Sequence, residues 1–143
     1  MQLSPRLAAI VNTLPLWEGI RVLEIGCGPG VAAREIAKRI GSGYVLGIDR
    51  SLKAILQALK SAPGEVASGV LGFRQIAIED FELPAGDPVF DLAFAVRVGA
   101  LDGRHPRLEQ QALANIAKAL TKKGRLFIDG GNPLKELSLL RYR

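Results

Sequence analysis

Three glycines at alternate positions, Gly26, Gly28 and Gly30, separate an apolar segment from a helix-forming one. The residues before them, Val22–Ile25, are typical of a short buried strand, and residues 31–40 have the apolar spacing of a helix. Glycine is needed where the backbone turns sharply or lets a ligand approach closely, because any Cβ would fill that space. A helix that starts there offers unpaired N–H groups to an anionic group. The sequence therefore predicts a strand–turn–helix unit that binds a nucleotide-type cofactor.

Further along the chain, apolar segments of strand length alternate with segments of helical periodicity. The segments expected to follow the first strand as buried strands are Tyr44–Ile48, Val70–Ala77, Phe90–Val96 and Arg125–Asp129. Apolar residues spaced three and four apart predict helices between them, for example at residues 52–59 and 112–120. Such alternation is typical of right-handed βαβ crossovers that build a parallel sheet covered on both faces. We therefore expect one α/β domain over residues 1–143, with a Rossmann-like doubly wound sheet of about five parallel strands.

The composition of the chain indicates the class and the cellular environment of this domain. Hydrophobic residues make up 48% of the 143 residues, which suits a well-filled core. No segment has about 18 consecutive uncharged apolar residues, so we expect no membrane span, and residues 1–20 lack the pattern of a secretory signal. The single cysteine, Cys27, can form no internal disulfide, which favours a reducing cytoplasm. A net charge of +5 is consistent with an anionic partner.

Two interpretations compete at the glycine turn. The segment Gly28–Ala33 fits the G-x-G-x-x-A pattern of dinucleotide sites, and Asp49 lies about where a ribose-binding acid is expected, which favours a nicotinamide-dependent oxidoreductase. Glu24 argues against it, because dinucleotide sites usually begin with an uninterrupted apolar strand. The segment Glu24–Gly30 instead resembles the first motif of the class I S-adenosylmethionine-dependent methyltransferases.

The resemblance to this family continues in the same order along most of the chain. The segment Gly47–Ser51 is similar to the family's second motif, whose acid binds the ribose hydroxyls; the acid here is Asp49, followed by Arg50. Glu79 and Asp80 lie where the family has its adenine-proximal acid, and either is a candidate. The resemblance implies S-adenosylmethionine as the cofactor and methyl transfer to an acceptor as the activity.

The resemblance also implies a role for each part of the cofactor site. The helix start after Gly30 suits the methionyl carboxylate, and Glu24 is placed to meet the ammonium group, directly or through water. A carboxylate at Asp49 can accept two hydrogen bonds from ribose hydroxyls. Taken singly these residues have plainer roles, since Asp49 or Ser51 can cap a helix and Glu24 can be a surface acid. The cofactor-binding residues expected, with no metal ligands among them, are Glu24, Gly26, Cys27, Gly28, Gly30, Asp49, Arg50, Glu79, Asp80 and Val96.

No catalytic residue is identified by the sequence alone. Cys27 is expected to be a small loop residue rather than a nucleophile. The only histidine, His105, follows the fourth strand, where it is a candidate general base, although a solvated loop histidine is the plainer interpretation. Arg97, Arg104 and Arg107 lie in the same segment. They are consistent with an anionic acceptor and equally with a solvated charge cluster.

The C-terminal segment departs from the family pattern. The family's sheet continues after the fifth strand with an antiparallel hairpin, for which residues 133–143 are too few, so we expect the hairpin to be lacking. Leu134–Leu140 is instead expected to form a short apolar helix. Arg125–Asp129 would then be an exposed sheet edge, and such edges favour pairing with another chain. We therefore expect a homodimer through the fifth strand and the C-terminal helix.

Two functions of different class remain open at this point. One is a minimal methyltransferase. The other is a non-catalytic S-adenosylmethionine-binding module of a larger assembly. The methyl acceptor itself is not identified by these residues.

Overall fold

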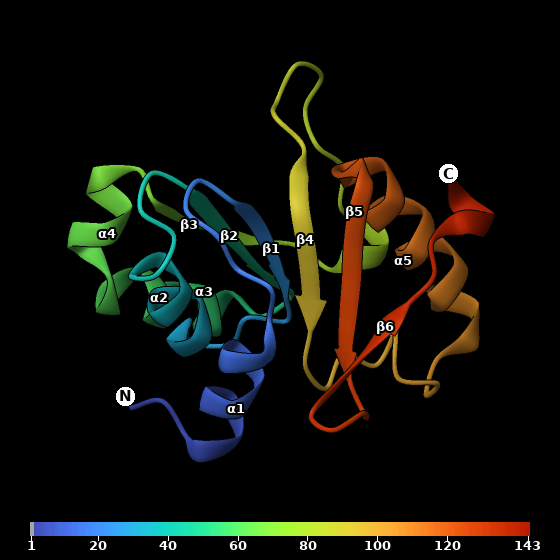
Figure 1. The fold of residues 1–143 in the computed structure, drawn as a ribbon, viewed down its shortest axis with the longest axis horizontal. Coiled ribbons are helices and arrows are strands. Elements are labelled where there is room, and N and C mark those ends of the chain that lie inside the picture. Colours follow the sequence, from blue (N-terminus) through green and yellow to red (C-terminus); the bar gives the residue numbers. More distant parts are fainter. Residues whose placement is uncertain (1) are drawn as a thin grey trace.

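Helices and strands alternate along the chain much as the apolar pattern predicts. The computed structural model describes residues 2–143 (Figure 1). Its strands are β1 (Arg21–Ile25), β2 (Tyr44–Asp49), β3 (Leu71–Gln75), β4 (Phe90–Ala95), β5 (Leu120–Asp129) and β6 (Leu134–Leu137). Its helices are α1 (Pro5–Thr13), α2 (Val31–Ala37), α3 (Leu52–Ser61), α4 (Pro63–Ser68) and α5 (Pro106–Ala119), with 3-10 turns η1 (Ile78–Asp80) and η2 (Leu140–Tyr142).

The strands form one six-stranded sheet in the order β3-β2-β1-β4-β5-β6. The strands β1 to β5 run parallel, and β6 runs antiparallel to β5. The chain builds the sheet outwards from β1, first toward β3 and then through β4 toward β6. In open α/β sheets, ligands bind beyond the carboxyl ends of the strands, where the strand order reverses. That point lies between β1 and β4.

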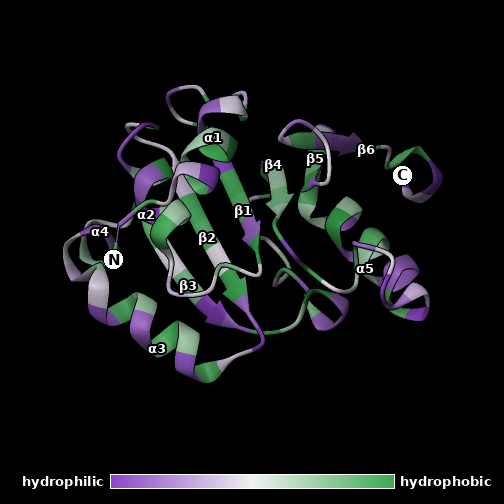
Figure 2. Cartoon of the chain, turned by 90° about the horizontal axis from the view of Figure 1, so that it is seen from below, coloured by the Kyte–Doolittle hydropathy of each residue, from purple (hydrophilic) through white to green (hydrophobic). Residues whose placement is uncertain are grey.

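Alternate residues of β1 pack on opposite faces of the sheet, which explains why both faces are covered by helices. Val22 packs with buried residues of α1 and α2, such as Ile10 and Ile36. Leu23, on the opposite face, packs with buried residues of α5, such as Ile116. Figure 2 shows the largely hydrophobic central strands between these helical layers. The doubly wound α/β fold predicted from the sequence is confirmed.

The C-terminal segment corrects the sequence-based expectation. Residues 134–137 form a strand, not part of a helix, and pair with β5 from Leu126↔Leu137 to Asp129↔Leu134. Leu134 and Leu137 pack against different faces of the sheet, as residues an odd number apart in a strand do. The sheet therefore ends in one antiparallel strand, β6, where we expected a helix, and β5 is not the outer edge.

The beginning of β5 also differs from the prediction. The strand starts at Leu120 rather than at Arg125, because Leu120 already pairs with Phe90 of β4. A register irregularity follows before Arg125 pairs with Leu92. A long strand with an irregular start is not visible in the apolar pattern, since Thr121–Gly124 has the composition of a turn.

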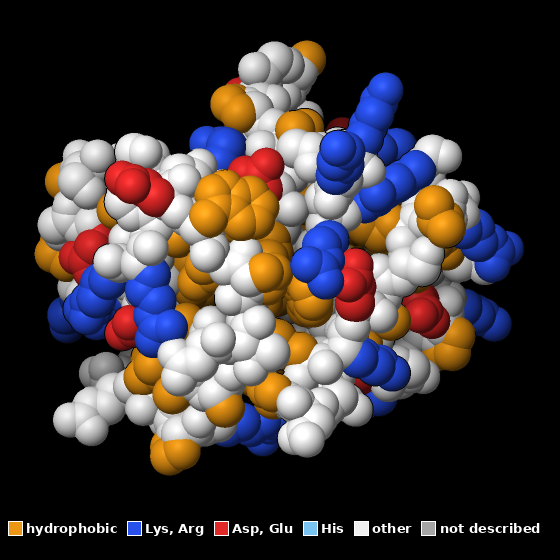
Figure 3. Space-filling view, viewed as in Figure 1, with side chains coloured by type: hydrophobic (Ala, Val, Ile, Leu, Met, Phe, Trp, Pro, Cys, Tyr) orange, Lys and Arg blue, Asp and Glu red, His pale blue; other side chains and the backbone are white. Residues whose placement is uncertain are grey.

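Basic side chains gather at the end of the sheet opposite the carboxyl ends of the parallel strands. Figure 3 shows Lys and Arg side chains over the start of β5 and the C-terminal segment; the exposed ones in these segments include Lys122, Lys123, Arg125, Arg141 and Arg143. These basic residues are therefore remote from the ligand end of the sheet. In residues 2–143, no helix has the length and apolar character that crossing a membrane requires.

Candidate functional site

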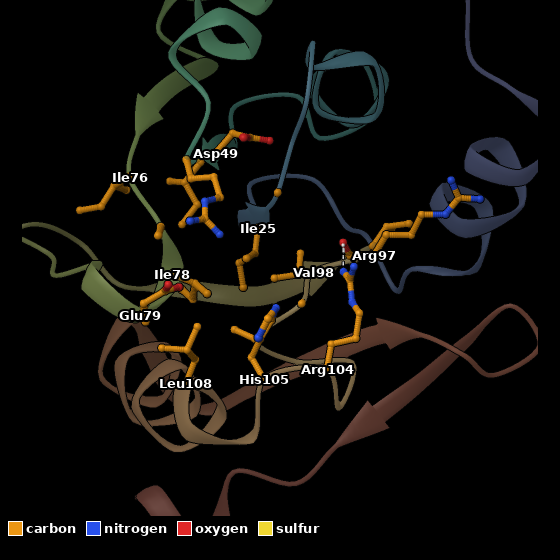
Figure 4. A pocket seen from close by; sticks show the side chains of 17 residues that line it. Ile25, Asp49, Ile76, Ile78, Glu79, Arg97, Val98, Arg104, His105 and Leu108 are labelled. Carbon is orange, nitrogen blue, oxygen red and sulfur yellow. Dashed lines mark hydrogen bonds between the residues drawn. The ribbon is translucent and has the colours of Figure 1, made fainter.

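A cavity of about 310 Å³ opens at the carboxyl ends of β1, β2, β3 and β4 (Figure 4). Its walls are the glycine turn after β1, the end of β2, η1 after β3, and the segment between β4 and α5. Five of the residues predicted to bind a cofactor line it, namely Gly26, Asp49, Arg50, Glu79 and Val96. The other five, namely Glu24, Cys27, Gly28, Gly30 and Asp80, are not among the lining residues.

Backbone hydrogen bonds tie the glycine turn to the neighbouring strand. The N–H groups of Gly26 and Cys27 donate to the carbonyl of Ile48 at 2.8 and 2.9 Å. Gly26 has a φ of +73°, and a Cβ there would lie 2.7 Å from Cγ2 of Val98. Glycine is required at this position both for its backbone conformation and for space.

Gly28 and Gly30 have different roles in the same turn. Gly30 is the N-cap of α2 with a φ of +84°, and a Cβ on it would lie 2.6 Å from Cζ of Phe73. Gly28 has a φ of +53°, but the space where its Cβ would lie is open. Gly30 is thus needed for packing, whereas Gly28 leaves its open side free for a ligand.

Asp49 connects the end of β2 to the glycine turn. Its Oδ2 accepts the N–H of Gly28 at 2.8 Å, and its Oδ1 accepts the N–H of Ser51 at 2.9 Å. The N-cap of α3 is Ser51, whose Oγ accepts the N–H of Ala54 at 3.2 Å. Each carboxylate oxygen of Asp49 keeps a further lone pair. Because Asp49 also lines the cavity, it can accept hydroxyl donors of a ligand there.

Glu24 is buried beneath the glycine turn rather than being a surface acid. Glu24 is only 4% exposed, and its Oε1 has no hydrogen-bond partner within residues 2–143. Burial raises the pKa of this carboxyl to about 8; the backbone N–H of Ala33 opposes the rise, and the carboxylate of Asp49 adds to it. Glu24 is therefore mainly neutral below that pH. A cation bound beside it would favour its ionised form.

Cys27 has the properties of a packing residue. It is buried, and burial together with the carboxylates of Glu24 and Asp49 raises the pKa of its thiol. A thiol becomes a nucleophile as the thiolate, which this environment disfavours. The prediction that Cys27 is not a nucleophile is consistent with this environment.

The 3-10 turn η1 is held in place by a polar residue that the sequence analysis missed. Asn115 of α5 is 5% exposed, and its Nδ2 donates to the carbonyls of Ile78 and Glu79 at 2.9 and 2.8 Å. Gln111 donates to Oδ1 of Asn115 at 2.9 Å. Of the two candidate acids, Glu79 lines the cavity and Asp80 does not.

The segment between β4 and α5 forms the other end of the cavity. Arg97, Arg104 and His105 line it, whereas Arg107 does not. Figure 4 shows the Arg97 side chain turned away from the cavity, and the Arg104 guanidinium donates to the carbonyl of Arg97 at 3.3 Å. Arg104 also pairs with Asp102 at 2.7 Å. The three arginines are thus not assembled into one cluster.

His105 lies against the backbone of the same segment. Its Cδ2 would be 2.9 Å from a Cβ placed on Gly99, so the ring packs on this glycine. The ring also lines the cavity. The geometry is suitable for a proton acceptor from a bound hydroxyl group.

Apolar residues between the two ends of the cavity were not identified from the sequence. The apolar side chains concerned are Ile25, Ile76, Ile78, Val98 and Leu108. Their only signal is their position at or just after a strand, or at a helix start. Asn115 had a clearer signal, since it is a polar residue within the apolar stripe of Ala112, Ile116 and Ala119.

Comparisons with known proteins agree with this architecture. A family model described as a methyltransferase domain matches residues 22–124. The ubiquinone biosynthesis O-methyltransferase of Leptothrix cholodnii is 41% identical over 83 residues, which cover 54% of this chain and 32% of that protein. The trans-aconitate 2-methyltransferase of Methylobacterium nodulans is 28% identical over 131 residues, 92% of this chain and 46% of that protein. The chain thus spans about a third to a half of the length of these curated relatives.

Solved structures show the same fold. Phosphoethanolamine N-methyltransferase 1 of Haemonchus contortus, solved with phosphoethanolamine and S-adenosylhomocysteine, superposes with a TM-score of 0.71 at 19% identity. The match covers 86% of this chain and 24% of that one. The dinucleotide interpretation of Gly28–Ala33 has no support in these matches. The predicted family is confirmed: the chain belongs to the methyltransferase domain family.

Proposed function

We propose that the chain binds S-adenosylmethionine at the carboxyl ends of β1 to β4 and transfers its methyl group to an oxygen of a small acceptor. The observation that carries the proposal is the order of the groups along one cavity. From β3 to β4 the wall presents η1, Asp49, the glycine turn and Val96. The cofactor has an adenine, a ribose and a methionyl group in the same order.

The donors and acceptors of the wall match those of the cofactor. Asp49 has free lone pairs for the ribose hydroxyls, and Glu79 lies at the adenine end. The unpartnered oxygen of Glu24 beneath the glycine turn suits a bound ammonium group. Gly28 offers open space where the ligand approaches the backbone. When bound, the cofactor supplies the electrophilic methyl group, so the protein has to orient the acceptor and exclude water.

The acceptor oxygen is the finer part of the proposal. Two relatives named above are an O-methyltransferase of ubiquinone biosynthesis and a methyltransferase acting on trans-aconitate. In this chain, His105 lines the cavity, where its imidazole could take the proton of a hydroxyl acceptor. Arg104 lies beside it and supports an anionic group on the acceptor.

The test has a binding step and a transfer step. Calorimetry should detect binding of S-adenosylhomocysteine and none of NAD, and tighter binding of NAD would contradict the proposal. Transfer from isotopically labelled S-adenosylmethionine is then measured with catechols, hydroxybenzoates and tricarboxylates. Binding without transfer to any of these acceptors would favour the non-catalytic module.

A homodimer is the proposed assembly, but with a different surface from the one predicted. In residues 2–143 the outer strand is β6, which pairs with β5 alone, and Leu140, three residues after it, is 81% exposed. An unpaired strand edge next to an exposed leucine supports pairing with a second copy. Light scattering tests this, with Leu140→Lys as the disrupting variant; a monomeric mass for the unmodified chain would contradict it. The cytoplasmic setting stays a prediction from the single cysteine.

A further inference from the structure

Arg97, directly after the cavity residue Val96, has an unusual backbone conformation. Its φ is +58°, and in residues 2–143 it is the one non-glycine residue with a positive φ. This left-handed conformation is unfavourable for a residue with a Cβ, and it persists only where surrounding contacts hold it. Specific contacts must therefore hold Arg97 in this conformation.

The contact is made by Asp129 at the end of β5. Its Oδ1 accepts the N–H of Arg97 at 3.0 Å. Its Oδ2 accepts from Nη2 of Arg6 on α1 at 2.8 Å, in an ion pair with a largely exposed arginine side chain. On the other side of Arg97, its carbonyl accepts from Arg104. The left-handed residue is thus held at both its N–H and its carbonyl.

Fixing the N–H of Arg97 also fixes a group in the cavity. That N–H and the carbonyl of Val96 belong to one peptide unit, which is trans and planar, so the two groups point in opposite directions. The carbonyl oxygen of Val96 lies 4.0 Å from where a Cβ on Gly26 would be, so it faces the glycine turn. A rotation of this peptide unit would turn the oxygen away.

A carbonyl oxygen at this place is an acceptor for one group of the cofactor. S-adenosylmethionine carries hydrogen-bond donors on its adenine, its ribose and its ammonium group. In the proposed binding mode the adenine and ribose donors would meet η1, which follows β3, and Asp49, at the end of β2, whereas Val96 follows β4 on the far side of β1. The ammonium group is the remaining donor, and Glu24 lies beneath the same turn.

We infer that Asp129 is a positioning residue, which directs the carbonyl of Val96 toward the ammonium group of the bound cofactor through the N–H of Arg97. The inference rests on the proposed function, since it needs this cofactor in the cavity. Asp129 itself is not among the residues that line the cavity. It acts through the peptide unit of Val96 and Arg97, so its effect is confined to the end of the ligand that this unit faces.

The test compares two ligands that differ at that end. S-adenosylhomocysteine has the amino and carboxylate groups, whereas 5′-methylthioadenosine lacks both. By calorimetry, Asp129→Ala should weaken S-adenosylhomocysteine about tenfold, as expected for one misdirected hydrogen bond to a charged group, and leave 5′-methylthioadenosine within about twofold of the unmodified protein. Equal weakening of both ligands, or no weakening of either, would overturn the inference.

Two further variants separate the position of the Asp129 oxygen that accepts the N–H of Arg97 from the charge of the carboxylate. Asp129→Asn keeps an oxygen in place to accept the N–H of Arg97, so it should bind S-adenosylhomocysteine nearly as the unmodified protein does. Asp129→Glu keeps the charge but displaces the oxygens by one methylene, and should behave like Asp129→Ala. The reverse order, with Glu retaining the affinity and Asn losing it, would overturn the positioning role.

Controls address folding and the underlying function. Arg6→Gln removes the other partner of Asp129 and should keep most of the affinity for both ligands; a loss as large as that of Asp129→Ala would contradict the inference. If Asp129→Ala does not fold, the Asn and Glu pair decides the matter alone. Absence of S-adenosylhomocysteine binding by the unmodified protein would refute the proposed function as well, which distinguishes that failure from a failure of Asp129 alone.

Discussion

Replacing the buried Glu24 with glutamine should change how the stability of this protein depends on pH. The pKa of Glu24 is about 8 in the folded protein and 4.5 as the ordinary value, because burial disfavours the charged form. Between these two pH values the unfolded chain has released the proton and the folded chain retains it. The free energy of unfolding therefore falls as the pH rises through this window. Glutamine has no proton to release and should lack this contribution.

The size of the effect follows from the shift. A rise from 4.5 to about 8 is a difference of about 3.5, which at about 1.4 kcal/mol per unit amounts to something on the order of 5 kcal/mol. The new amide hydrogens would be buried without an acceptor, at a cost of about 1–3 kcal/mol. The free energy of unfolding of Glu24→Gln should therefore equal or fall below that of the unmodified protein at pH 5. At pH 9 it should exceed that of the unmodified protein by a few kcal/mol.

Urea denaturation at pH 5, 7 and 9 measures this directly, since both proteins should unfold with a similar slope against urea. Glu18→Gln is the matched control, because Glu18 is exposed and undergoes the same chemical change. Parallel curves for Glu24→Gln and the unmodified protein across pH 5 to 9 would refute the reasoning. They would mean that Glu24 is already ionised in the folded protein.

Cofactor binding gives a second measure of the same group. If an ammonium group binds beside Glu24, it lowers the pKa of Glu24, and binding at pH 7 releases a proton. Calorimetry in two buffers of different ionisation enthalpy counts the protons released. Glu24→Gln should release about one proton fewer on binding S-adenosylhomocysteine and should bind it more weakly. An equal number of protons would separate Glu24 from the ammonium site.

Five other substitutions test the rest of the site. In urea denaturation, Gly28→Ala should lower the free energy of unfolding by about 1–2 kcal/mol, because Gly28 has a positive φ. Gly26→Ala should lower it by more, because Gly26 also has a positive φ and its new methyl would lie 2.7 Å from Val98. Asp49→Ala should weaken S-adenosylhomocysteine by about thirtyfold in calorimetry, because the ribose acceptor and the bond to Gly28 are both lost, and an unchanged affinity would make Asp49 purely structural. Asn115→Leu should lower the free energy of unfolding by about 1–3 kcal/mol, as two carbonyls of η1 lose their donor. Once an acceptor is known, His105→Asn should lower the rate of methyl transfer, because the ring nitrogen that would take the acceptor's proton is lost; an unchanged rate would exclude His105 as the base.

The sequence predicted the parts of this protein whose structure is set by neighbouring residues. The glycine turn, the strand before it and the acid at the end of β2 all depend on short-range patterns, and the structure has them where expected. The helix predicted for Leu134–Leu140 was wrong, because the leucines of this segment fit a helical spacing as well as a strand with both faces covered. The choice was made by pairing with β5, which a local pattern does not contain.

For the same reason, only part of the candidate site could be predicted from the sequence. The residues that face the cavity could be named from motifs, but several residues that hold them could not. Asp129 is 32 positions from its partner Arg97, and Asn115 is 36 and 37 positions from the carbonyls it binds. Neither belongs to a motif, and each contacts backbone groups, which every residue type possesses. Only the folded chain identifies such pairs.

These two residues also show how the second half of the chain controls a cavity whose cofactor-binding motifs lie mostly in the first half. Asn115 on α5 holds the wall at the end of β3, and Asp129 on β5 holds the peptide unit at the end of β4. They act on walls of the same cavity that lie on opposite sides of β1. A change at Asn115 should therefore affect mainly the adenine end of a bound cofactor, and a change at Asp129 mainly the methionyl end. Binding of 5′-methylthioadenosine distinguishes the two, because it should weaken with Asn115→Leu and remain nearly unchanged with Asp129→Ala.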